Sequence, residues 1–83
     1  MTGPVRPVSR NFKAVLQQVA QLDFGEAPSY DVLCEGGHGH AGMFEVVAVV
    51  GTRRFAVARA PTREDAEQAA AKLALQTILF EKS

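Results

Sequence analysis

The stretch "APTREDAEQAAAKLAL", residues 60–75, predicts how the chain ends. Thr62 stands where a helix N-cap should be, and Asp65 three residues later can complete a capping box. Behind them, mostly small apolar residues recur at helical spacing: Ala66, Ala70, Leu73, Ala74 and Ile78. Small side chains allow close approach, so the stretch predicts a helix that lies directly on a sheet. Its first turn carries three acids and a single base, Arg63.

A second helical pattern occupies residues 10–21. Apolar residues recur there with the spacing of one helical face: Phe12, Val15, Leu16, Val19 and Ala20. Ser9 can cap this first helix through its hydroxyl group. Gln17 and Gln18 lie off the apolar stripe, so we expect them to face solvent.

Between the two helices the apolar period changes to two. Three alternating runs, at residues 29–34, 44–50 and 53–59, are separated by the stretch "EGGHGHAG" and by Gly51. Such runs joined by turns predict an antiparallel meander. The third run is expected to hold four residues on one face: Arg53, Phe55, Val57 and Arg59. The predicted fold class is α+β, in the order helix, three-stranded antiparallel sheet, helix, with both helices packed on one face of the sheet.

Length and charge set further limits. The chain has 83 residues, which is room for one small domain, expected at residues 9–80 with a flexible lead-in at 1–8 and a tail at 81–83. Nine bases balance nine acids, so the domain as a whole offers no attractive field to a polyanion. The apolar runs are too short to span a membrane, and we expect an intracellular location, cytoplasmic or nuclear.

The sequence predicts neither an enzyme nor a site for a metal, cofactor or small molecule. No nucleophile, base and orienting group recur at a spacing typical of catalysis. One cysteine and two histidines fall short of a closed zinc site. Cys34 takes an inward position in its run and is expected to be a small core residue.

The motifs taken together resemble a known family. Gly37, His40 and Phe44 fit a loop pattern G-P-x-H-x-x-x-F, with His38 in place of the proline. The segment "PSYDVL" at residues 28–33 is similar to the proline-x-tyrosine that opens the family's first strand. The last helix fits the family register at its alanines and leucine: Ala66, Ala70, Ala71, Ala74 and Leu75. From residue 9 to residue 76 the chain resembles the double-stranded RNA-binding domain family, which implies the same α-β-β-β-α fold.

The resemblance implies three places of RNA contact. The first helix would bring Gln17 and Gln18 to one minor groove, and the loop would reach the next with four residues: Gly37, His38, Gly39 and His40. The third place, for phosphate, is the start of the last helix, where the family has S-K-K-x-A-K. This chain has "TREDAE" at those positions, residues 62–67, so Arg63 alone keeps its base and two bases become acids.

The charge reversal at the last helix can be weighed by simple electrostatics. Acids at a helix N-terminus favour the macrodipole by ~0.3–1 kcal/mol each, whereas bases there oppose it. An acid about 4 Å from a phosphate charge is repelled by ~1 kcal/mol in water and ~4 kcal/mol at an effective dielectric constant near 20. We therefore predict that binding of double-stranded RNA is weak or absent, and that the domain acts mainly in protein–protein interaction or dimerisation.

An alternative is genuine but weakened, shape-specific binding of double-stranded RNA. It would use the first helix, the His40 loop and Arg63. A basic patch could support it, made of the bases near the first helix and the third strand: Arg6, Arg10, Lys13, Arg53, Arg54 and Arg59.

For the interaction role, the expected partner is a protein or a second copy of the chain in a homodimer. The edge of the third strand and the C-terminal helix would form the contact. Its candidate residues are apolar side chains in excess of what a small core requires: Leu33, Val47 and Val49 on the sheet face opposite the helices, Phe55 and Val57 on the third strand, and Leu75, Leu79 and Phe80 on the last helix.

Overall fold

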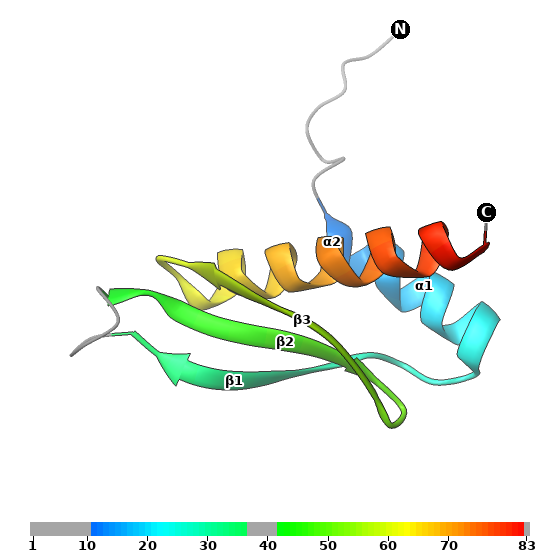
Figure 1. The fold of residues 1–83 in the computed structure, drawn as a ribbon, viewed down its shortest axis with the longest axis horizontal. Helices are drawn as coiled ribbons and strands as arrows, with labels where there is room; N and C mark the ends of the chain where they lie inside the picture. Colours follow the sequence, from blue (N-terminus) through cyan, green and yellow to red (C-terminus); the bar gives the residue numbers. More distant parts are fainter. Residues whose placement is uncertain (1–10, 37–41, 83) are drawn as a thin grey trace, which may run out of the picture.

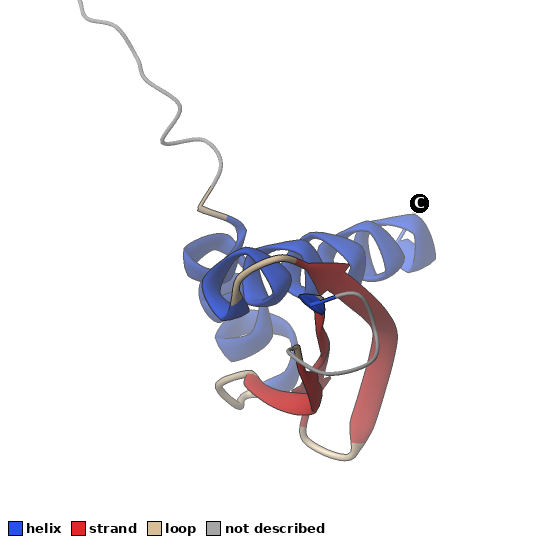
Figure 2. Ribbon diagram, turned by 90° about the vertical axis from the view of Figure 1, so that its left-hand side faces the viewer, coloured by secondary structure: helices blue, strands red, loops and turns tan. Residues whose placement is uncertain are grey.

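The computed structural model describes residues 11–36 and 42–82. In chain order it contains five elements: α1 (Phe12–Phe24), β1 (Ser29–Glu35), β2 (Phe44–Val50), β3 (Arg53–Ala60) and α2 (Arg63–Lys82). The sheet is antiparallel with strand order β1-β2-β3, and both helices lie on the same side of it (Figure 1). The view turned by 90° separates a helix layer from a strand layer (Figure 2). The predicted α+β fold is confirmed.

Helix α1 begins and ends later than the sequence pattern predicted. Its N-cap is Asn11, whose Oδ1 accepts a hydrogen bond from the backbone N–H of Ala14 at 3.2 Å. The predicted cap, Ser9, lies outside the described residues. At the other end the helix stops at Gly25, which adopts a left-handed conformation with φ of 71° that glycine tolerates without strain. The apolar pattern does not include the capping glycine, so it predicted an end at residue 21 that is three residues too early.

Helix α2 is longer than predicted, because it runs to Lys82. Residues 81 and 82, expected to belong to a tail, are its last turn. Glu81 forms an ion pair with Arg53 of β3, and Lys82 forms one with Asp23 of α1 at 2.8 Å. The last turn is therefore tied to both of the elements that flank it.

The core lies between the helices and the sheet. It combines residues of α1, β2, β3 and α2: Leu16, Val46, Ala48, Ala58, Ala60, Ala66, Ala70, Ala71, Ala74, Leu75 and Ile78. Leu75, predicted to face outward, is only 7% exposed, whereas Val15, predicted to face inward, is 47% exposed. Helix α2 packs against β2, β3 and α1, so it buries a wider arc than a single stripe. Leu75 is therefore a core residue and no longer an interface candidate.

Both outer strands depart from strict alternation. In β3 two residues, Phe55 and Ala56, lie opposite Ala48 alone, because the register with β2 shifts by one between Val47 and Val49. Phe55 therefore packs against the core, while Val57 lies on the opposite face. The prediction that these two residues share a face was wrong.

In β1 the register with β2 also shifts, between Val32 and Cys34. The shift makes Leu33 the extra residue, and it pairs Cys34 with Glu45. Cys34 is partly exposed rather than part of the buried core cluster, so its predicted core role was wrong. A bulge moves the following side chains to the other face of the sheet, but the alternation of apolar residues in the sequence does not reveal it.

The sheet face opposite the helices is less open than predicted. Val47, expected to be exposed there, is only 1% exposed. Arg54 of β3 reaches Asp31 of β1 at 2.8 Å, and this ion pair spans the central strand beside Val47. On the same face Leu33 and Val57 remain 48% and 46% exposed. Val47 is thus covered within the domain and is not available as an interface residue.

Candidate nucleic-acid interface

Helix α1 and the loop before β2 hold the first two predicted RNA contacts. Gln17 and Gln18 are both exposed on α1, where a ligand can reach them. The four loop residues, 37–40, lie outside the described residues. Directly before the loop, a Cβ on Gly36 would lie 3.0 Å from the carbonyl oxygen of Gly42, so only glycine lets the two loop ends approach this closely.

The start of α2, the third predicted contact, has its cap as expected. The Oγ1 of Thr62 accepts a hydrogen bond from the backbone N–H of Asp65 at 3.1 Å. One turn further on, the Nε of Arg63 lies 3.4 Å from Oε2 of Glu67. The one base that this site retains is therefore paired with an acid of the same helix.

Glu67 also binds a base of α1. The Nζ of Lys13 lies 2.5 Å from Oε1 of Glu67 and 3.1 Å from Oε1 of Glu64. The hydrogen bond to Glu67 raises the pKa of Lys13, although partial burial opposes this. Hydrogen bonds from Gln68 and Lys13 lower the pKa of Glu64. Both acids that replace family bases thus serve as internal partners of Lys13.

Gln68 completes this connection between the helices. Its Oε1 accepts a hydrogen bond from the backbone N–H of Lys13 at 3.1 Å, and that N–H is one that a helix start leaves unpaired. Its Nε2 donates to Glu64 at 2.9 Å and to Asn11 at 3.3 Å. We call these five residues the helix clamp: Asn11, Lys13, Glu64, Glu67 and Gln68. The clamp was missed at the sequence level because its two halves lie more than 50 residues apart.

The arginines proposed as a basic patch do not gather on one surface. Arg54 and Arg59 lie on the sheet face opposite the helices, where they pair with Asp31 and Glu45 at 2.8 and 2.9 Å. Arg53 binds Glu81 through both of its terminal nitrogens. Lys13 is in the helix clamp, while Arg6 and Arg10 lie outside the described residues. Each described arginine is therefore already paired with an acid.

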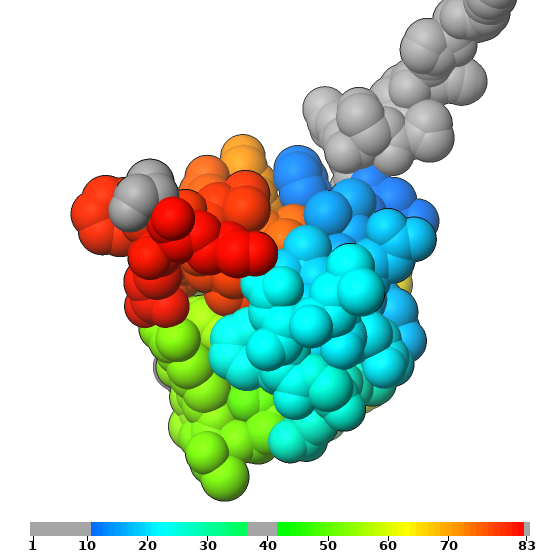
Figure 3. Space-filling model, turned by 90° about the vertical axis from the view of Figure 1, so that its right-hand side faces the viewer, coloured from blue at the N-terminus to red at the C-terminus, as the bar shows by residue number. Residues whose placement is uncertain are grey.

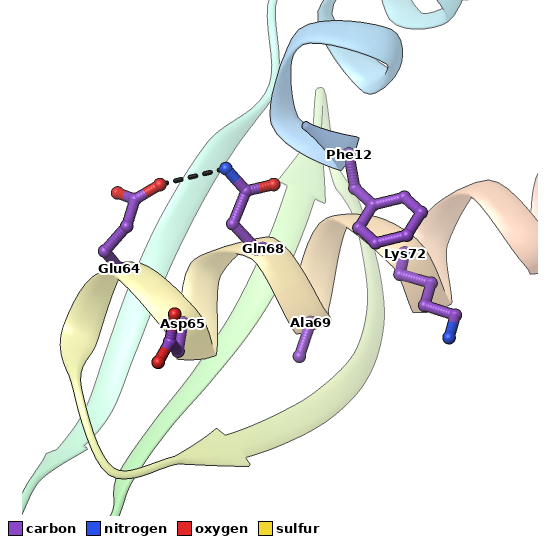
Figure 4. A pocket seen from close by; sticks show the side chains of 6 residues that line it. All are labelled: Phe12, Glu64, Asp65, Gln68, Ala69 and Lys72. Atoms are coloured by element: carbon purple, nitrogen blue, oxygen red, sulfur yellow. Dashed lines mark hydrogen bonds between the residues drawn. The ribbon is translucent and has the colours of Figure 1, made fainter. Parts of the chain in front are cut away.

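Beside the clamp there is a hollow of about 440 Å³ at the surface (Figure 4). Its lining comes from the start of α1 and from the first half of α2: Phe12, Glu64, Asp65, Gln68, Ala69 and Lys72. Within the described parts of the chain, no three histidine, cysteine or acidic residues are placed to hold a metal ion. The lining combines apolar side chains with charged ones of both signs.

Comparison with known proteins agrees with this geometry. The family model described as "Double-stranded RNA binding motif" matches residues 12–78. The chain belongs to the double-stranded RNA-binding domain family. The matched residues include α1, the three strands and α2 as far as Ile78. No helix in residues 11–36 or 42–82 is long and apolar enough to cross a membrane.

Similar curated proteins include several bacterial enzymes named Ribonuclease 3. The protein from Rhodopirellula baltica is 46% identical over 70 residues, which is 84% of this chain and 26% of that protein. That from Geobacter metallireducens is 36% identical over 72 residues, 87% of this chain and 29% of that protein. The protein from Sulfurovum sp. is 30% identical over 74 residues, which is 89% of this chain and 33% of that protein. The chain therefore spans a third or less of the length of these relatives.

Proposed function

We propose that this double-stranded RNA-binding domain works mainly in protein–protein interaction or dimerisation, and that it binds double-stranded RNA weakly or not at all. The observation that carries the proposal is the position of Glu67. It lies within ion-pair distance of both Arg63, in the first turn of α2, and Lys13 of α1. A phosphate arriving there would have to displace an acid from each of them.

The size of the effect follows from charge. Glu64 and Asp65 stand exposed in the same turn, and each repels a phosphate at about 4 Å by ~1 kcal/mol in water. Non-specific nucleic-acid binding has a dissociation constant of only ~10⁻⁴–10⁻⁶ M. Together the two acids cost ~2 kcal/mol, a factor of about thirty, which moves this binding toward the millimolar range.

The interaction surface is supported by apolar side chains that remain exposed around β3 and the C-terminal half of α2. Val57 is 46% exposed, Leu79 57% and Phe80 80%. Strand β3 is an edge strand, so a second chain could extend the sheet from it. Of the other predicted residues, Leu33 stays exposed, while Val49 and Phe55 are partly buried.

The C-terminal end of α2 offers a second apolar area next to α1. Leu22 and Phe24, near the end of α1, are 85% and 38% exposed. The ion pair between Asp23 and Lys82 joins this segment to the last turn of α2. Figure 3 shows the two helix ends side by side on this side of the molecule. An isologous dimer that paired β3 edges would bring these helix ends close to the contact.

A second candidate function is weakened binding of double-stranded RNA. Membership of the family favours it, as do the exposed amides of Gln17 and Gln18. This reading requires Arg63 to leave Glu67 for a phosphate.

Titration with a duplex of about 20 base pairs at low salt separates the two functions, since a domain of this family spans about 16 base pairs. The proposal expects no saturation below the high micromolar range. Micromolar, salt-sensitive binding would overturn it and support the second candidate.

Light scattering of the isolated domain tests self-association. A dimer that Phe80→Ser weakens, while the exposed control Gln76→Ser on the same helix does not, supports the homodimer. A monomer over a wide concentration range would restrict the interaction to a different protein.

A further inference from the structure

The hollow beside the helix clamp carries two opposite charges, Asp65 and Lys72, that have no ion-pair partner among residues 11–36 and 42–82. Asp65, Ala69 and Lys72 project from the same side of α2, while Glu64 and Gln68 point toward α1 (Figure 4). Among the described residues, neither Asp65 nor Lys72 forms an ion pair. The other lysines and arginines of residues 11–36 and 42–82 all do. Lys72 is therefore the one lysine or arginine of the described residues whose charge is available to a partner, and Asp65 offers the opposite charge in the same hollow.

The spacing of these two charges keeps them from neutralising each other. Asp65 and Lys72 are seven residues apart on α2, which corresponds to about 10 Å along the helix axis. The ring of Phe12, contributed by α1, lies next to Lys72, whose Nζ is 5.6 Å from the ring centroid. Together with Ala69 the ring gives the hollow an apolar wall between an acidic end and a basic end.

This layout has the dimensions of a short extended peptide. In a polyproline II segment, residues i and i+3 lie on the same side and about 9 Å apart, since the rise is ~3.1 Å per residue and there are three residues per turn. Such segments dock on aromatic-lined grooves and lose little conformational entropy. Arginine and lysine stems also pack well along aromatic and aliphatic walls.

We propose that the hollow binds a polyproline II segment of a partner protein in which a basic residue faces Asp65 and an acidic residue three positions away faces Lys72. This inference rests on the proposed function, because it assigns to a protein the face that a family member would turn to RNA. Glu64 adds negative potential at the acidic end, although its own oxygens are engaged by Lys13 and Gln68. An all-basic segment fits less well, because its second base would meet Lys72.

The test uses four capped peptides that differ only in charge: Gly-Arg-Pro-Pro-Glu-Gly and the versions with two arginines, two glutamates or two glutamines. Amide chemical shifts of the whole chain are followed at up to millimolar peptide. The mixed-charge peptide is expected to shift the signals of Phe12, Asp65, Ala69 and Lys72, and to bind more tightly than the other three.

Two variants and a control locate the contact. Asp65→Asn and Lys72→Gln should each weaken the mixed-charge peptide about two- to fivefold, as for exposed ion pairs. Lys72→Gln should also remove the disadvantage of the two-arginine peptide. Glu35→Gln, an exposed acid on β1 away from the hollow, should change nothing.

Several results would overturn the inference. It fails if no peptide shifts these signals, or if the glutamine peptide shifts them equally. It also fails if a 20-base-pair RNA duplex shifts them and the peptides do not, since the hollow then serves RNA. The proposed function fails separately, by micromolar binding of the duplex to the unaltered chain, so the two failures can be told apart.

Discussion

Restoring the family's bases at the start of α2 should improve RNA binding and weaken the fold at the same time. The double substitution Glu64→Lys and Glu67→Lys places lysines where the family has them. It also removes both acidic partners of Lys13 and sets two new positive charges against it. Within the domain, the acids at the positions of the family's bases are also the ion-pair partners of Lys13 on α1.

The two magnitudes can be estimated from the contacts. The double variant changes the charge at the phosphate site by four units, worth ~2–4 kcal/mol in water, or about 30- to 1,000-fold in affinity. Two added phosphate contacts should steepen the plot of log affinity against log salt by nearly two units. Partly exposed ion pairs contribute ~0.2–1 kcal/mol each, so losing two and adding repulsion should cost ~1–3 kcal/mol. For a domain of this size that lowers Tm by about 4–8 °C per kcal/mol.

Fluorescence anisotropy with a labelled 20-base-pair duplex measures the first effect, and thermal unfolding without RNA measures the second. The matched control adds Lys13→Glu to the double variant, which rebuilds the ion pairs with reversed signs. Its stability should return toward that of the original chain, and its gain in RNA affinity should be smaller because the new carboxylate holds both lysines.

Two results would refute this reasoning. If the double variant binds the duplex no better than the original chain, the acids are not what limits RNA binding. If it keeps its full stability and the triple variant gains none, Lys13 does not stabilise the packing of α1 on α2.

Three further predictions concern the clamp and its neighbours. Gln68→Ala should lower the free energy of unfolding by about 1–2 kcal/mol, because the backbone N–H of Lys13 loses its acceptor. The exposed control Gln76→Ala should lower it by less than about 0.5 kcal/mol, and chemical denaturation measures both. Tyr30→Phe should leave stability unchanged or raise it by up to about 1 kcal/mol, since burial raises the pKa of the Tyr30 hydroxyl and that group has no hydrogen-bond partner in the described structure; a clear loss of stability would show that it has one. Stability should fall as the pH drops below the normal glutamate value of 4.5, because the pKa of Glu64 is lower when folded. It should also fall at alkaline pH, because the pKa values of Lys13 and Tyr30 are both higher when folded. Unfolding across pH should show a smaller alkaline decline for Lys13→Met than for the original chain, and an unchanged decline would contradict the role of Lys13.

Local patterns were sufficient for the order of the elements and for most of the core. The alanine spacing of α2, the Thr62 cap and the three alternating runs all predicted what the structure contains. Each of these signals acts between residues close in sequence, through helical or strand periodicity and a side chain that caps its own helix. The exposed positions of Gln17 and Gln18 followed from the same periodicity.

Departures from the pattern arose where strands and helices meet. A one-residue bulge in β3 turned Val57 away from the face of Phe55, and an ion pair across the sheet covered Val47. Leu75 became a core residue because α2 packs on both the sheet and α1. None of these effects changes the local periodicity, so the sequence pattern could not indicate them.

For the charges at the start of α2, too, the sequence predicted one property and the packing of the helices decided another. Their sign was readable from the sequence, and it predicted a helix start that repels phosphate. The partners of these acids could not be predicted from the sequence. Lys13 lies 51 residues from Glu64 and 54 from Glu67, and it meets them only when the helices pack. Pairing between distant residues depends on the three-dimensional approach of their side chains. Tertiary packing therefore decided that the acids which replace the family's bases also hold the two helices together.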